Sequence, residues 1–123
     1  MAKKIVMIVD DEAPINKVVE DILEPEGYKV VSALNGTEAL DKLKRAKVDL
    51  ILIDFFMPGL SGRELCEKIR ADSKLKKLKV AFLTAATLSP TGMKELDKMN
   101  VLEYIKKPFE YKDLIKRVKK MIG

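Results

Sequence analysis

Polar side chains lie at the carboxyl ends of four apolar segments in this 123-residue chain. They are Asp10 and Asp11 after Ile5–Val9, Asp54 after Leu50–Ile53, Thr84 after Val80–Leu83, and Lys107 shortly after Val101–Ile105. If three carboxylates meet at one edge, they repel one another unless a cation lies between them. Mg²⁺ fits best, because it binds one or two carboxylates together with waters and phosphate oxygens. The pattern therefore indicates a magnesium-dependent site for a phosphoryl group.

Asp54 is the candidate nucleophile of such a site. A carboxylate at a strand tip can attack phosphorus and form an acyl phosphate. Lys107 offers a cation to the phosphoryl oxygens, and Thr84 offers a hydroxyl donor. Each residue alone has a simpler interpretation, as a turn former, a helix cap, a strand-terminal threonine or a solvated lysine. The set favours the phosphoryl site because all its members are expected at one rim.

The elements that must position these residues alternate along the chain. Five apolar runs and five amphipathic runs predict one α/β domain over residues 1–123, with five parallel strands and five helices. The predicted strands are Ile5–Val9, Tyr28–Ala33, Leu50–Ile53, Val80–Leu83 and Val101–Ile105. Polar residues inside the second and fifth strands place those two at the sheet edges. In such sheets, ligands bind beyond the carboxyl ends of the strands.

Several helices have recognisable ends and buried stripes. Ser61 and Glu64 have capping-box spacing, and Ser89-Pro90 predicts the start of the fourth helix. The stripe of the first helix is predicted as Ile15, Val18, Val19, Ile22 and Leu23; that of the second as Ala39, Leu40, Leu43 and Ala46; and that of the fourth as Met93, Leu96 and Met99.

Composition excludes several classes of function. Cys66 is the only cysteine and the chain has no histidine, so an internal disulfide, the usual zinc sites and histidine-based triads are excluded. The formal charge of +5 is spread among acidic residues, which favours a solvated surface over direct nucleic-acid binding. No apolar run is long enough to insert in a membrane and no signal peptide is evident, so we expect a cytoplasmic protein.

Four motifs together resemble the receiver domain of two-component response regulators, in its stand-alone, CheY-like form. The motifs are Ile8-Val9-Asp10-Asp11-Glu12, Asp54-Phe55-Phe56-Met57-Pro58-Gly59 with Gly62, Thr84-Ala85, and Tyr104 ahead of Lys107-Pro108-Phe109. The resemblance covers nearly the whole chain. It implies a single doubly wound five-stranded parallel sheet of the flavodoxin-like (CheY-like) kind, with strand order 2-1-3-4-5.

The resemblance also implies a role for each site residue. Asp54 is the phosphoacceptor, Asp11 and Asp54 bind Mg²⁺ with the backbone carbonyl of Phe56, and Asp10 acts mainly through water. Lys107 pairs with the phosphoryl group, and the Lys107-Pro108 peptide is cis. Thr84 and Tyr104 form a switch, in which the threonine moves toward the phosphoryl group and the aromatic ring fills the space.

The function implied is that of a signalling protein rather than an enzyme, one that catalyses only its own phosphorylation and dephosphorylation. A sensor histidine kinase or phosphotransfer protein donates the phosphoryl group, and a downstream target protein binds the face formed by the fourth helix, fifth strand and fifth helix. A monomer is expected, with a phosphorylation-dependent dimer left open, and chemotaxis is one pathway by analogy.

Three other classes of function use a similar sheet. Phosphatases with an aspartyl nucleophile have the pattern Asp-x-Asp after the first strand, whereas this chain has adjacent Asp10-Asp11. The absence of a cap domain also counts against this class. A flavodoxin-like cofactor carrier needs a loop of glycines and hydroxyls for phosphate, and the acidic loop here repels one. A phosphorylation-independent protein-interaction module on the same fold stays the alternative.

Overall fold

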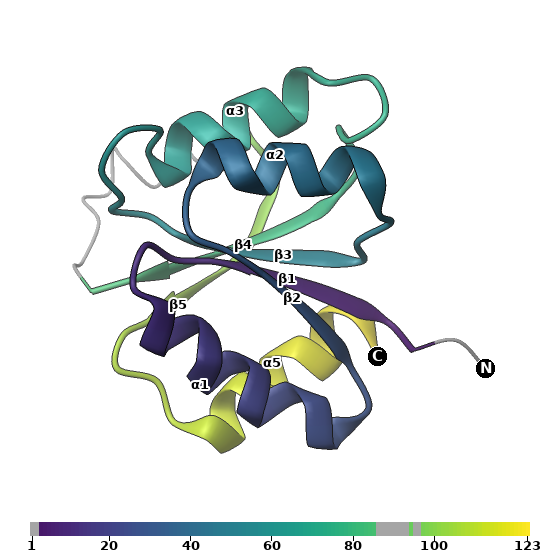
Figure 1. Cartoon of the computed structure of the whole chain (residues 1–123), viewed down its shortest axis with the longest axis vertical. Helices are drawn as coiled ribbons and strands as arrows, with labels where there is room; N and C mark the ends of the chain where they lie inside the picture. The colour runs from purple at the N-terminus through teal and green to yellow at the C-terminus, as the bar shows by residue number, and fades with distance from the viewer. Residues whose placement is uncertain (1–2, 86–93, 95–96) are drawn as a thin grey trace.

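The computed structural model describes residues 3–85, 94 and 97–123, and these contain one five-stranded sheet (Figure 1). All neighbouring strands are parallel, in the order β2-β1-β3-β4-β5. The strands are β1 (Ile5–Val9), β2 (Lys29–Ala33), β3 (Leu50–Asp54), β4 (Lys79–Thr84) and β5 (Val101–Lys106). The predicted order and both predicted edge strands are confirmed.

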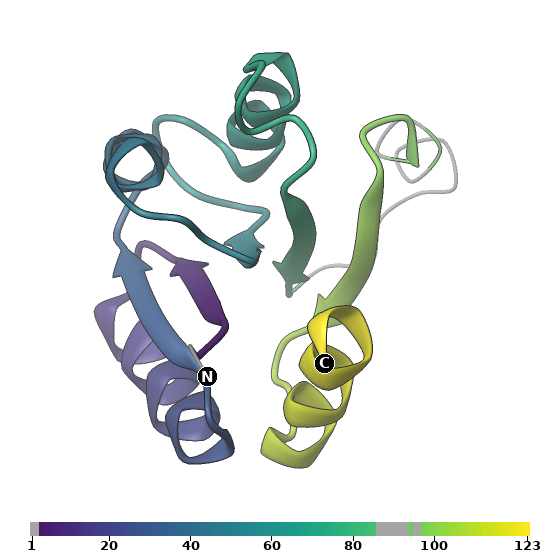
Figure 2. The same ribbon diagram turned by 90° about the vertical axis from the view of Figure 1, so that its right-hand side faces the viewer.

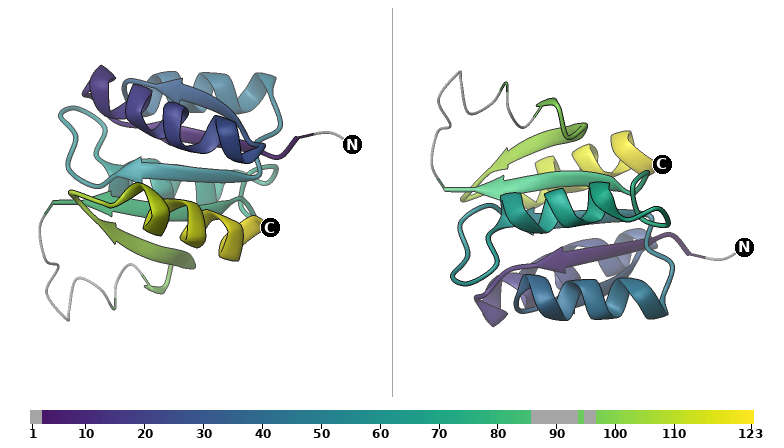
Figure 3. Two further views of the ribbon diagram at one scale, coloured as in Figure 1. Left: turned by 90° about the horizontal axis from the view of Figure 1, so that it is seen from below. Right: turned by 90° about the horizontal axis from the view of Figure 1, so that it is seen from above.

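Helices cover both faces of the sheet (Figures 2 and 3). On one face lie α2 (Gly36–Arg45) and α3 (Gly62–Ala71), and on the other lie α1 (Ala13–Leu23) and α5 (Tyr111–Ile122). A short 3₁₀ turn, η1 (Glu24–Glu26), follows α1. This is a doubly wound sheet, and each face buries its own apolar cluster.

The central strand β3 shows why the sheet is covered twice. All five of its residues are buried, and successive side chains point to opposite faces. Ile51 and Ile53 join the cluster under α2 and α3, whereas Leu50 and Leu52 join the cluster under α1 and α5. Its position in the middle of the sheet follows from this uninterrupted apolar run, and it carries Asp54 to the sheet edge.

Local turn chemistry sets where the elements begin and end. The Ser61 hydroxyl accepts from the Glu64 N–H while the Glu64 carboxylate accepts from the Ser61 N–H, which confirms the predicted capping box at α3. The Asn35 side chain caps α2 by accepting from the Glu38 N–H at 2.8 Å. Asn100 has a φ of 56°, a left-handed conformation that asparagine adopts more readily than most residues, at the turn before β5.

Some sequence-based expectations were wrong in detail. Val18 is 45% exposed, because the buried face of α1 runs through Asn16, Val19 and Leu23. Ala46 is exposed, because α2 ends at Arg45 and Ala46 has an extended backbone beyond it. Four of the five strands differ from the predicted bounds by a residue at one or both ends, and β3 includes Asp54.

The predicted fourth helix lies mostly outside the residues that the structure describes. Its Met93 and Leu96 belong to the undescribed part, whereas Met99 packs against the cluster under α3. The described part contains the four α-helices given above. Among the described residues, no helix has the length and apolar character needed to cross a bilayer.

Candidate functional site

The register of the sheet brings the predicted site residues to one edge. Val9 of β1 pairs with Ile53 of β3, so Asp10 comes next to Asp54. Thr84 pairs with Lys106, and the Lys107 N–H donates to the Thr84 carbonyl at 2.8 Å. The five groups expected at the carboxyl edge therefore occupy the ends of four strands there.

Three carboxylates gather at the centre of this edge. Carboxylate oxygens of Asp10, Asp11 and Asp54 lie within 4.8 Å of one another. Asp10 is fully buried and Asp54 is 7% exposed, whereas Asp11 is open to solvent. Lys107 Nζ lies 2.5 Å from Asp10 Oδ2 and 3.6 Å from Asp54 Oδ1. One ammonium group thus faces two buried carboxylates.

The site has three carboxylates and one ammonium group, so it carries a surplus of negative charge. Burial raises the pKa of Asp54 to about 6, and the charges of Asp10 and Asp11 add to that effect, while Lys107 and the Phe56 N–H oppose it. Burial lowers the pKa of Lys107, but its hydrogen bond and attraction to Asp10 and its attraction to Asp54 outweigh this and raise it. An all-oxygen donor set with surplus negative charge fits a hard divalent cation such as Mg²⁺.

Asp54 is held by the backbone around it as well as by Lys107. The Phe56 N–H donates to Asp54 Oδ1 at 3.3 Å, and the Phe55 N–H donates to the Leu83 carbonyl at 2.9 Å. The Phe56 side chain is 55% exposed, so the residue two places after Asp54 lies against solvent. The chain after β3 therefore orients the carboxylate and leaves its approach open.

Gly62 allows α3 to start close to this strand end. Its N–H donates to the Phe55 carbonyl at 3.2 Å. A Cβ at this position would lie 2.5 Å from the Asp54 carbonyl oxygen and 2.8 Å from the Phe55 Cα. The lack of a side chain is thus a packing requirement at residue 62.

Thr84 and Tyr104 lie on the neighbouring strands β4 and β5. Thr84 is 5% exposed at the end of β4. The Tyr104 ring stacks on Phe82, with ring centroids 6.1 Å apart, and its buried hydroxyl has no hydrogen-bond partner in the structure described. The Lys107-Pro108 peptide is cis, as expected.

Residues 6–119 match the family model described as the response regulator receiver domain. The chain belongs to this family. A curated relative, a probable transcriptional regulator named ycf29 from Porphyra purpurea, is 36% identical over 94% of the chain. The match spans 55% of that relative's own length.

Solved receiver structures resemble the chain over nearly its whole length. The chemotaxis protein CheY4 of Vibrio cholerae, crystallised at low pH, is 32% identical with a TM-score of 0.91, and the match covers 98% of this chain and 99% of CheY4. The response regulator TrrA from Thermotoga maritima, solved in complex with Mg²⁺ and BeF, is 36% identical with a TM-score of 0.80, and the match covers 96% of this chain and 98% of TrrA. A CheY-like receiver from Methanospirillum hungatei is 33% identical with a TM-score of 0.86, and the match covers 99% of this chain and 96% of that receiver.

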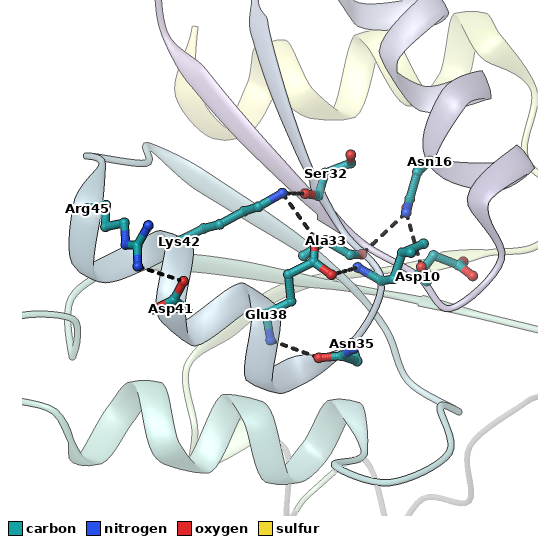
Figure 4. A network of polar contacts seen from close by, with 10 residues as sticks. Asp10, Asn16, Ser32, Ala33, Asn35, Glu38, Asp41, Lys42 and Arg45 are labelled. Carbon is teal, nitrogen blue, oxygen red and sulfur yellow. Dashed lines mark hydrogen bonds and ion pairs between the residues drawn. The ribbon is translucent and has the colours of Figure 1, made fainter.

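Asn16 is a part of this receiver's site that sequence reasoning missed. Its buried amide nitrogen donates to the Asp10 carbonyl at 3.1 Å and to the Ala33 carbonyl at 3.3 Å (Figure 4). It thereby ties α1 to the loop that carries Asp10, whose Oδ1 also accepts from the Glu12 N–H at 2.9 Å. The available signal was the spacing of Asn16, Val19 and Leu23, which places Asn16 on the buried stripe of α1.

Replacing Asp54 by Asn is expected to stabilise the metal-free receiver at neutral pH. Asp54 has a pKa of about 6 in the fold against 3.8 in a free chain, so between these values the folded state binds more protons. The wild type therefore loses stability as pH rises from 4 to 6, and the variant does not. At pH 7 we expect the free energy of unfolding of the variant to exceed that of the wild type by about 1–2 kcal/mol. This is less than the pKa shift alone would give, because partial hydration of the carboxylate reduces the effect.

Urea unfolding in EDTA, followed by circular dichroism at several pH values, measures this difference. The gain is expected to vanish near pH 4. A gain that is the same at pH 4 and pH 7 would contradict the electrostatic explanation.

Proposed function

We propose that this receiver accepts a phosphoryl group on Asp54 from the phosphohistidine of a sensor histidine kinase or phosphotransfer protein, in the cytoplasm and with Mg²⁺. Phosphorylation then changes its affinity for a downstream protein. The observation that carries the proposal is the arrangement of Asp10, Asp11 and Asp54 around Lys107 at the sheet edge.

The transfer follows from the groups present. An Asp54 carboxylate oxygen forms a bond to phosphorus as the phosphorus–nitrogen bond to the donor imidazole breaks, and the imidazole keeps the electron pair. Lys107 then pairs with the phosphoryl oxygens, and Thr84 donates its hydroxyl to them. Asp11, Asp54 and the Phe56 carbonyl are the proposed Mg²⁺ ligands, with Asp10 acting through water; the ion would offset the negative charge that gathers during transfer.

We place the response to phosphorylation at Thr84 and Tyr104. A buried hydroxyl without a partner is costly, so the Tyr104 ring has a reason to leave its present position when space opens beside it. Movement of Thr84 toward the phosphoryl group would open that space. The proposed output face comprises β5, α5 and the helix predicted after Ser89-Pro90.

Intact-mass measurement after incubation with acetyl phosphate tests the proposal. With Mg²⁺ the wild type should gain the mass of one phosphoryl group, and in EDTA it should not. Asp54→Asn should gain nothing, and Asp11→Asn should react at least tenfold more slowly because it removes a proposed metal ligand. Asp41→Asn, which replaces an exposed carboxylate on α2, serves as the matched control and should behave like the wild type.

Two results would contradict the proposal. One is a mass gain that survives in the Asp54→Asn variant. The other is a wild type that stays unmodified at every Mg²⁺ concentration, which would favour the phosphorylation-independent interaction module.

A further inference from the structure

A basic hollow lies at the opposite end of the sheet from Asp54. It has a volume of about 550 Å³ and is lined by residues of the segment joining α2 to β3 and of the segment joining α3 to β4. Both segments lie at the right of Figure 1. Because the strands are parallel, this end gathers their amino ends, whereas the acidic cluster lies at their carboxyl ends. The hollow is therefore separate from the phosphoryl site.

The hollow carries a surplus of positive charge. Its cationic lining residues are Lys44, Arg45, Lys47, Lys74, Lys77 and Lys79. Asp49 is the one acidic lining residue, and its Oδ2 already accepts from the Ile5 N–H at 2.8 Å. Arg45 pairs with Asp41, and Lys79 donates to the Met121 carbonyl. Among the described residues, four exposed lysines have no ion pair and no side-chain hydrogen bond. Two of them, Lys44 and Lys47, belong to the chain before β3, which forms one wall of the hollow, and the other two, Lys74 and Lys77, belong to the chain before β4, which forms the other wall.

Apolar residues also line the hollow. Leu75 and Leu78 are partly exposed, whereas Leu43 and Val48 are buried. No aromatic side chain lines it, so it lacks the stacking surfaces that hold nucleic-acid bases. A hollow lined by both apolar and cationic residues also differs from the flat contact that a lipid surface needs. It complements a ligand that carries an apolar group between carboxylates.

We propose that the basic hollow binds an acidic peptide segment of a partner protein. An apolar side chain of the segment packs on Leu75 and Leu78, and flanking Asp or Glu residues pair with lysines of the two walls. The attraction does not depend on the state of Asp54, because the two sites lie at opposite ends of the sheet. The receiver would thus hold this partner before and after phosphorylation.

Fluorescence anisotropy with a labelled peptide, Glu-Asp-Glu-Leu-Asp-Glu-Asp, tests the proposal on the unphosphorylated 123-residue chain at about 0.1 M salt, where charges more than about 10 Å apart are largely screened. The variant Lys47→Glu/Lys77→Glu should weaken binding at least tenfold, because it reverses one charge on each wall. Lys116→Glu/Lys120→Glu changes the net charge equally at exposed positions on α5, and it should weaken binding less than about threefold. Replacing the peptide's Leu by Ser should cost about tenfold.

Further arms separate the alternatives. Lys44→Ala/Lys74→Ala should weaken binding without reversing charge, and circular dichroism should show each variant folded. Asp54→Asn should bind the peptide like the wild type, so failure here is distinguishable from failure of the phosphoryl-transfer proposal. Equal losses in the two charge-reversal variants, or equal binding of the Leu and Ser peptides, would overturn the inference. Tighter, Lys47- and Lys77-dependent binding of duplex DNA or anionic vesicles would also overturn it.

Discussion

Replacing Lys107 by Met is expected to lower the free energy of unfolding of the metal-free protein by about 2–4 kcal/mol at pH 7. The change removes the ammonium group that lies 2.5 Å from the fully buried Asp10 and 3.6 Å from Asp54. The carboxylates would then repel one another without that compensation. Methionine keeps much of the apolar stem, so lost packing contributes little.

Urea unfolding in EDTA and in excess Mg²⁺ checks this prediction. The cost should shrink with Mg²⁺, which supplies the missing positive charge, and it should shrink in acid, where protons neutralise the carboxylates. The neighbouring exposed Lys106→Met is the control and should cost less than about 0.5 kcal/mol. Equal costs at the two positions, or no effect of Mg²⁺, would show that Lys107 is not the counter-ion of the cluster.

Replacing Gly62 by Ala is expected to destabilise the protein by about 2–4 kcal/mol. The added Cβ would overlap the backbone of the strand that ends in Asp54, and backbone atoms cannot rotate away. Gly36→Ala is a matched control at the start of α2, where the three atoms nearest to the new Cβ all belong to the Leu60 side chain, which can shift more easily than backbone. Thermal unfolding of both variants compares them, and a larger loss at Gly36 would contradict the account.

Much of this fold could be predicted because its signals are local. The apolar run Leu50–Ile53 indicates a central strand whatever surrounds it, and the polar residues within β2 and β5 indicate edges. The Ser61–Glu64 pair and Asn100 specify a helix start and a turn through their own chemistry. The rule that ligands bind at the carboxyl ends of parallel strands then placed Asp54 at a site.

The features that sequence reasoning missed depend on contacts between distant segments. The polar side chain of Asn16 is expected to face solvent, and its two carbonyl partners become neighbours only in the folded sheet. Val18 is apolar and therefore expected to face the core, yet it is exposed. The sequence predicts solvated lysines around residues 44 and 77, because nothing local indicates that the two segments line one hollow.

Borohydride reduction of the protein treated with acetyl phosphate and Mg²⁺ tests the central claim most directly. Hydride converts an aspartyl phosphate to homoserine, and peptide sequencing by mass spectrometry then locates the converted residue. We predict homoserine at position 54 in the wild type, and none when Mg²⁺ is withheld. Conversion at another carboxylate, or a phosphoryl group that resists borohydride, would contradict the assignment of Asp54 as the acceptor.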